Sequence, residues 1–177
     1  VKRGRWVREK LLAGVVPDVP ITVDAKIPED PHKTLRDRLA GATSSAACMK
    51  CHSRMNDLGY PFEVFDDFGR FRKKEDLEHP DNIIKVGKGN EQDVYKTLPI
   101  NSTGFLDGTG DPKLDGKVTD ALDLITKLSR SERVRQSIIR HAFRYYMGRN
   151  ETLADSQTLI DADQAYVKSG GSFKAVI

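Results

Sequence analysis

The sequence contains few cysteines, no long apolar run and no strong charge of one sign. Only two of its 177 residues are cysteine, Cys48 and Cys51, which excludes a framework of several disulfides. No stretch approaches the roughly 20 consecutive apolar residues that a membrane-spanning helix needs. The net charge of +3 is too small to indicate a protein that binds nucleic acid. These absences leave a chain with neither many disulfides nor a membrane span nor a nucleic-acid partner.

The sequence also lacks an initiator methionine and a signal peptide. It begins at Val1, and residues 172–177 stop where a new helix is predicted to begin, so we expect a piece of a longer protein. Hydrophobic residues make up 38% of the chain and charged residues 31%, which is typical of a soluble globular domain. The length is sufficient for one domain or two small ones.

What the sequence does contain is a single Cys-x-x-Cys-His segment at residues 48–52. This is the attachment signature of a c-type haem. Two thiols that lie three residues apart project from the same side of a helix, so both can bond to the vinyl groups of one porphyrin. The histidine that follows can then bind the iron as proximal ligand. The segment therefore predicts one covalent haem c per chain, held by Cys48, Cys51 and His52.

Two other uses of a paired cysteine motif fit this sequence less well than haem attachment. A structural zinc site of this kind needs two further ligands at a similar short spacing, whereas His32, His79 and His141 are scattered singly. A thioredoxin-like redox pair should follow a strand in a βαβ unit, whereas residues 35–47 look helical or small and polar. Haem attachment is the interpretation that the spacing favours.

The stretch after the motif is the most aromatic part of the chain. Tyr60, Phe62, Phe65 and Phe68 fall within nine positions. Core packing is the commoner use of aromatic side chains, and lining a haem pocket is one form of core packing. We therefore predict that Tyr60, Phe62 and Phe65 contribute to the haem pocket.

Hydrophobic spacing predicts a mainly α chain with a small β element. The haem helix is expected to begin at a cap within residues 43–45, to run to about Met55 and to be ended by Asn56 and Gly59. Ser129 and Glu132 form a predicted capping box for a later helix. Other helices are expected at 5–13, 34–40, from 118 onward, 132–147 and 154–168, with a strand at 82–88, a helical turn at 93–97 and short strands within 102–116. Residues 16–33 are rich in proline and are expected to be extended.

This pattern divides the chain into three regions. Residues 1–33 form an N-terminal helix and an extended segment, and residues 34–117 form a cytochrome c-like haem-binding region. Residues 118–177 form a C-terminal helical subdomain that is expected to cover the distal face of the haem. The predicted fold class is therefore a mainly α, cytochrome c-like haem domain.

A six-coordinate haem iron needs a second ligand on the other face of the ring. Met147 ends a predicted helix, and a thioether there would raise the reduction potential and suit electron transfer. His141 lies on an apolar stripe, where a lone histidine is more often a core residue. Met49 and Met55 are too close to the proximal histidine and are expected to pack. A third alternative is an iron with no distal protein ligand, which favours binding of a small gas or peroxide chemistry.

Several separated segments resemble one protein family. The chain resembles the C-terminal haem module of the large planctomycete-type cytochrome proteins in residues 3–6, 34–39, 48–52, 57–63, 65–66, 69–70, 140–144, 147–151 and 169–173. Members often have Asp-Pro-Leu-Gly after the haem histidine, whereas residues 56–59 here read Asn-Asp-Leu-Gly. The resemblance implies an exported, periplasmic domain of a larger protein. Its implied partners are a redox protein or other domains of the parent chain.

The sequence as a whole thus predicts a mono-haem electron-transfer domain. The alternative is a gas-binding or redox-sensing module whose distal ligand is open or exchangeable. A peroxidase-like enzyme ranks last: His141 with Arg140 or Arg144 supplies the residue types it needs, but neighbouring residues such as Arg140 and His141 point to different faces of their helix.

Overall fold

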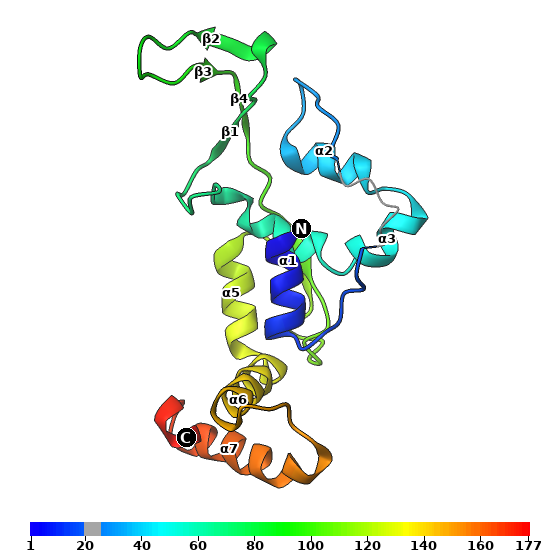
Figure 1. The fold of residues 1–177 in the computed structure, drawn as a ribbon, viewed down its shortest axis with the longest axis vertical. Helices are drawn as coiled ribbons and strands as arrows, with labels where there is room; N and C mark the ends of the chain where they lie inside the picture. Colours follow the sequence, from blue (N-terminus) through cyan, green and yellow to red (C-terminus); the bar gives the residue numbers. More distant parts are fainter. Residues whose placement is uncertain (20–25) are drawn as a thin grey trace.

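Helices and short antiparallel strands alternate along an elongated molecule (Figure 1). The computed structural model describes residues 1–19 and 26–177, and about half of the chain is helical. Its α-helices are α1 Lys2–Trp6, α2 Leu35–Ala42, α3 Ala46–His52, α4 Asn56–Gly59, α5 Ala121–Arg130, α6 Glu132–Met147 and α7 Ser156–Lys168. The fold is therefore mixed α with small β elements. The middle of the predicted extended segment, residues 20–25, lies outside the described residues.

In the part of the chain that the structure describes, the strands form three separate two-stranded antiparallel sheets. Their bounds are β1 Lys74–Asp76, β2 Ile83–Lys85, β3 Val94–Tyr95, β4 Thr97–Pro99, β5 Gly104–Leu106 and β6 Gly116–Val118. The pairs β1–β4 and β2–β3 extend away from the helices at one end of the molecule (Figure 1). The predicted strand at 82–88 is confirmed by β2, and β5 confirms a short strand within 102–116. The predicted helical turn at 93–97 is wrong, because Val94 and Tyr95 have the β-branched and aromatic side chains that favour pairing with β2.

The N-terminal helix begins earlier than predicted and contributes a buried arginine. α1 starts at Lys2, and the chain continues from Val7 to Leu11 in wider, π-helical turns. The Arg8 side chain is only 9% exposed, and its Nε donates to the Arg54 carbonyl at 2.9 Å. Its Nη1 donates to the Asp107 carbonyl at 2.9 Å, and its Nη2 pairs with the Asp107 carboxylate. Arg8 therefore ties the N-terminal helix to the segment that follows the candidate haem motif.

α1 also crosses α4 at very short range. The predicted haem helix ends at His52 rather than near Met55, and residues 56–59 form the separate short helix α4. A Cβ built on Gly4 would lie 1.8 Å from the Met55 carbonyl oxygen and 2.8 Å from the Gly59 amide nitrogen. Asn56 and Gly59 thus do not end helical structure here. Gly59 instead lets a second helix approach.

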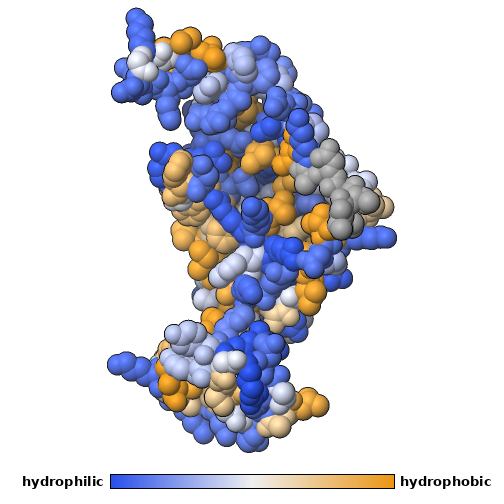
Figure 2. Space-filling model, viewed as in Figure 1, coloured by the Kyte–Doolittle hydropathy of each residue, from blue (hydrophilic) through white to orange (hydrophobic). Residues whose placement is uncertain are grey.

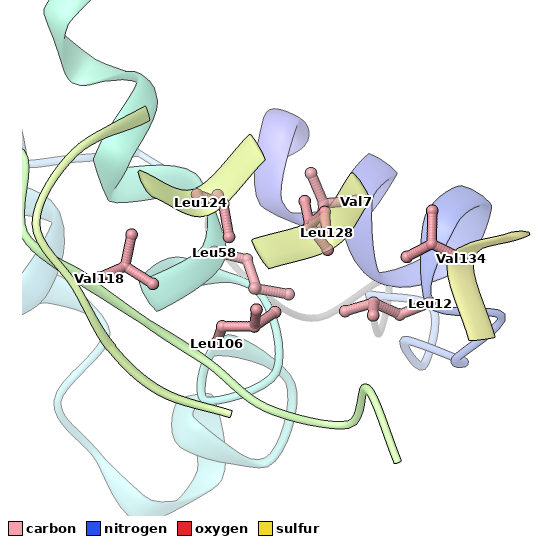
Figure 3. Packing of buried hydrophobic residues seen from close by; sticks show 8 residues of the cluster. All are labelled: Val7, Leu12, Leu58, Leu106, Val118, Leu124, Leu128 and Val134. Carbon is pink, nitrogen blue, oxygen red and sulfur yellow. The ribbon is translucent and has the colours of Figure 1, made fainter. Parts of the chain in front are cut away.

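One hydrophobic core joins the two ends of the chain. Leu58 from α4 and Leu106 from β5 are 1% and 0% exposed, and they pack with residues from the π-helical turns after α1 and from β6, α5 and α6. The buried cluster drawn in Figure 3 contains Val7, Leu12, Leu58, Leu106, Val118, Leu124, Leu128 and Val134. All three regions predicted from the sequence contribute to this cluster. The N-terminal residues are therefore part of the same packed unit as the C-terminal helices.

The start of the C-terminal helices differs from the prediction. Val118 lies in β6, so α5 begins only after Asp120, whose side chain accepts a hydrogen bond from the Asp123 amide at 2.9 Å. The predicted capping box of Ser129 is wrong. Ser129 lies inside α5, while Ser131 adopts the extended backbone of a cap and accepts from the Val134 amide at 3.4 Å.

α7 is attached to the rest of the fold largely by polar contacts. It contains no buried residue, and Ile160 and Val167, predicted to be partly inward, are 48% and 55% exposed. Arg135 of α6 donates to the Asp163 carboxylate of α7 at 2.7 and 3.0 Å. Figure 2 accordingly shows scattered hydrophobic patches on a mainly hydrophilic face. Within the described residues, no helix has the length and apolar character needed to cross a membrane.

The segment between α6 and α7 contains Glu151, whose protonation is expected to make this part of the fold sensitive to acid. Hydrogen bonds from Arg144, and then from Arg140, lower the pKa of Glu151 from 4.5 to about 2. A carboxyl group whose folded pKa is depressed stabilises the fold above its unfolded pKa, and this contribution is lost as the pH falls through the folded pKa. Because Glu151 pairs with two arginines of α6, we expect the segment between α6 and α7 to loosen between about pH 4.5 and pH 2, and Glu151→Gln to destabilise that segment at neutral pH by about 1 kcal/mol.

The measurement is an acid titration followed by NMR signals of the segment between α6 and α7. Glu132→Gln is the matched control, because Glu132 also pairs with an arginine of α6. Its carboxylate lies 3.4 Å from Arg135, and its side chain is 68% exposed. Glu132→Gln should keep the acid transition of the parent. If Glu151→Gln also kept it, the role given to Glu151 would be contradicted.

Candidate functional site

The helix α3 presents both cysteines of the predicted haem motif. Ser45 caps it, and the Ser45 hydroxyl accepts from the Cys48 amide at 3.2 Å, as the sequence predicted for a cap within residues 43–45. Cys48 and Cys51 are free thiols that are partly exposed. Because they lie three residues apart on α3, they project from the same side of that helix.

His52 is the last residue of α3, and its ring is held by side chains from neighbouring elements. The His52 Nδ1 lies 3.0 Å from the Asn56 Oδ1. The Asn56 amide nitrogen donates to the Thr43 hydroxyl at 3.3 Å, and that hydroxyl donates to the Leu39 carbonyl at 2.8 Å. Since Nδ1 is engaged in this way, Nε2 is the ring nitrogen left to bind a metal.

A cavity of about 410 Å³ lies beside the His52 ring. This volume is within the range of about 300–1,000 Å³ that is usual for sites of small molecules and cofactors. The lining comes from the end of α2, from α3 and from the start of α4, and consists of Ala40, Thr43, Ser44, Met49, His52, Ser53, Asn56, Asp57 and Tyr60. The predicted proximal ligand and one of the predicted aromatic residues therefore share one cavity.

One wall of this cavity is polar. Burial raises the pKa of the Tyr60 hydroxyl, and partial burial raises the pKa of Asp57, with the charge of Arg36 opposing both shifts. The Arg36 guanidinium lies 4.0 Å from the centre of the Tyr60 ring. It also donates to the carbonyls of Asn101 and Thr103 at 2.6 Å each. These contacts keep Tyr60 in place at the edge of the cavity.

The other predicted pocket aromatics lie elsewhere. Phe62 packs against the hydrophobic core, and Phe65 meets Phe71 edge to face with ring centres 6.0 Å apart. Neither lines the cavity beside His52. The sequence reasoning, in turn, missed Asn56 as a partner of His52. An asparagine four residues after a helical histidine is on the same face, and that spacing was the available signal.

The two distal candidates lie on α6, and neither lines the His52 cavity. His141 has its Nε2 2.9 Å from the Lys10 carbonyl, so it donates to that oxygen. Met147 is 53% exposed at the end of the helix. Met55 is 5% exposed, as expected for packing, whereas Met49 lines the cavity on the same helical face as His52. The structure therefore brings no distal candidate to His52.

The residues around His52 fit a covalently attached haem. Two free thiols project from one side of a helix and an imidazole with an unengaged Nε2 follows them, which is the donor set that haem c needs. His52 lines the cavity, whereas Cys48 and Cys51 are not among its lining residues. No group of three or more histidine, cysteine, aspartate or glutamate side chains that could hold a metal ion occurs in residues 1–19 and 26–177.

Fold and site together define a mixed α protein with small antiparallel sheets that presents a Cys-x-x-Cys-His helix beside a cavity. Residues 1–75 match a family model described as Protein of unknown function (DUF1588), and residues 115–177 match one described as Protein of unknown function (DUF1585). Both families are known from planctomycete-type cytochrome-like proteins. No curated protein and no solved structure matches the chain.

Proposed function

We propose that this chain is a cytochrome c-like domain that carries one covalent haem c and transfers electrons within a larger exported protein. Cys48 and Cys51 hold the porphyrin, and His52 binds the iron through Nε2. When bound, the haem supplies a one-electron redox centre. The chain's own residues attach it, orient the proximal imidazole and cover part of it. The electron partner is a redox protein or another domain of the parent chain, in the periplasm or an equivalent exported location.

The observation that carries this proposal is the state of His52. A histidine placed directly after a helical Cys-x-x-Cys pair has its Nδ1 occupied by Asn56 and lines a cavity of about 410 Å³. Metal-binding histidines characteristically use their second nitrogen as a donor to a protein acceptor, which fixes the ring. The same arrangement is not required for a redox-active cysteine pair.

The alternative function is a gas-binding or redox-sensing module. It is favoured by one observation, which is that His141 and Met147 do not line the cavity beside His52. In that case the distal side of the iron would be open or would hold an exchangeable ligand. Electron transfer with Met147 or His141 as distal ligand would need the α6 side chain to reach the haem.

The test is to produce the chain with a working haem-ligation system and to measure its intact mass and its optical spectra in both oxidation states. We expect an added mass of one haem, and no addition in the Cys48→Ala, Cys51→Ala double variant. Low-spin spectra in both states with no uptake of carbon monoxide support electron transfer. Ready uptake by the reduced form supports the alternative, and comparison of Met147→Ala with His141→Ala identifies a distal ligand. Bare thiols or bound zinc would overturn both functions.

A further inference from the structure

We propose that Asn56 is a positioning residue for His52. Its amide fixes which ring nitrogen carries the proton, and its lack of charge keeps the imidazole a weaker electron donor than a carboxylate partner would. This inference rests on the proposed haem function and deepens it by naming the group that adjusts the reduction potential of the site.

Hydrogen bonds link His52 to Asn56, Asn56 to Thr43, and Thr43 to the Leu39 carbonyl, and that carbonyl fixes the direction of all three. The Leu39 carbonyl can only accept, so the Thr43 hydroxyl donates its single proton to it. The Thr43 oxygen must then accept from Asn56, which requires the NH₂ group of the amide to face Thr43. The Asn56 oxygen therefore faces His52 at 3.0 Å, and the His52 Nδ1 must carry the proton. Nε2 is left with a free lone pair.

Most of this relay is buried, with His52 half-buried at its end, and it is built from three different elements. Thr43 and Asn56 are 7% and 6% exposed, and Leu39 is 8% exposed. Thr43 follows α2, His52 ends α3 and Asn56 begins α4. In a poorly hydrated environment a hydrogen bond is stronger and an unpaired polar group is more unfavourable than in water. The orientation of His52 therefore depends on the hydrogen bonds that Asn56 of α4 makes with Thr43 at the end of α2.

The chemical nature of the acceptor determines how strongly the imidazole donates to a metal. A carboxylate that accepts from Nδ1 increases the basicity of the ligating nitrogen and stabilises the oxidised metal. An amide oxygen is neutral and polarises the ring less. Asn56→Asp is nearly isosteric and converts the relay from the weaker acceptor to the stronger one. The haem-loaded Asn56→Asp variant should therefore have a lower reduction potential than the parent.

The experiment compares reduction potentials and iron–imidazole stretching frequencies of the haem-loaded 177-residue chain. We expect Asn56→Asp to lower the potential and to raise the frequency. Ser53→Asp is the charge-matched control, because Ser53 lines the same cavity but bonds only to the Met49 carbonyl, at 2.6 Å. It should shift the potential less than Asn56→Asp and leave the stretching frequency unchanged. Equal shifts in both variants would overturn the inference.

A second measurement does not depend on haem. Nitrogen chemical shifts of the His52 ring in the chain without haem report the two tautomers directly. We expect the Nδ1-protonated form alone in the parent, and a mixture of both forms in Asn56→Leu and Thr43→Val, each checked by circular dichroism for folding. If no variant changes the tautomer, Asn56 does not position His52, even where haem is attached. Absent haem with the expected tautomers would contradict the proposed function and leave the relay standing.

Discussion

Replacing Gly4 by alanine is expected to destabilise the folded chain by about 3 kcal/mol or more. The added Cβ would lie 1.8 Å from the Met55 carbonyl oxygen, which is backbone and cannot rotate away. α1 and α4 would have to separate, and the core around Leu58 would open with them. Urea denaturation measures this as a lower midpoint.

The matched control is Gly41→Ala. Gly41 lies on the exposed side of α2, where an added Cβ meets nothing within 4 Å. Alanine has the higher helix propensity, so this variant should gain about 0.5–1 kcal/mol. The same substitution is thus expected to have opposite signs at two helical glycines. Comparable stability of the two variants would show that α1 does not pack against α4 as described.

The two segments that match different families share one hydrophobic core. Val7 and Leu58 belong to the segment that matches one family, whereas Leu124 and Leu128 belong to the segment that matches the other. All four are buried in one cluster (Figure 3). Neither matched segment contains a complete core of its own, since each supplies only part of the cluster. The two segments therefore stabilise each other within this chain.

Much of the local structure could be predicted because its causes are close in the sequence. α6 has apolar residues at helical spacing and ends at Gly148, which adopts the left-handed conformation expected of a C-terminal cap. β2 has β-branched residues, and Ser45 stands directly before α3, the helix of the haem motif. The capping box failed because both Ser129 and Ser131 can cap a helix, and the turn between α5 and α6 places the cap at Ser131 although Val134 cannot complete the box.

The parts that could not be predicted depend on contacts between distant residues. Nothing near Arg8 in the sequence indicates that Asp107 will bind its guanidinium, or that Gly4 will meet Met55. The same applies to the candidate site. Cys48, Cys51 and His52 follow from spacing alone, whereas the contact between Asn56 and Thr43 requires the start of α4 to return to the end of α2. Of the aromatic residues predicted for the pocket, Tyr60 lines the cavity beside His52, whereas Phe62 packs against the core instead.

His52→Gly is expected to leave haem attached but to remove its proximal ligand. The two thioether bonds depend on Cys48 and Cys51, so the intact mass should still include one haem. The iron would lose the low-spin spectrum and the reduction potential that a protein imidazole confers. Removing the ring also enlarges the cavity beside α3, and Asn56 would keep an oxygen directed at the vacated space.

Free imidazole should therefore enter this space and restore the spectrum, at a concentration on the order of millimolar, which corresponds to a binding free energy of about −4 kcal/mol. His32→Gly is the matched control, because His32 is exposed on the loop before α2 and does not line the cavity. Its spectrum should equal that of the parent, with or without imidazole. An unchanged spectrum in His52→Gly, or a changed one in His32→Gly, would mean that the iron is bound by a different histidine. The cavity between α2 and α3 would then have another ligand.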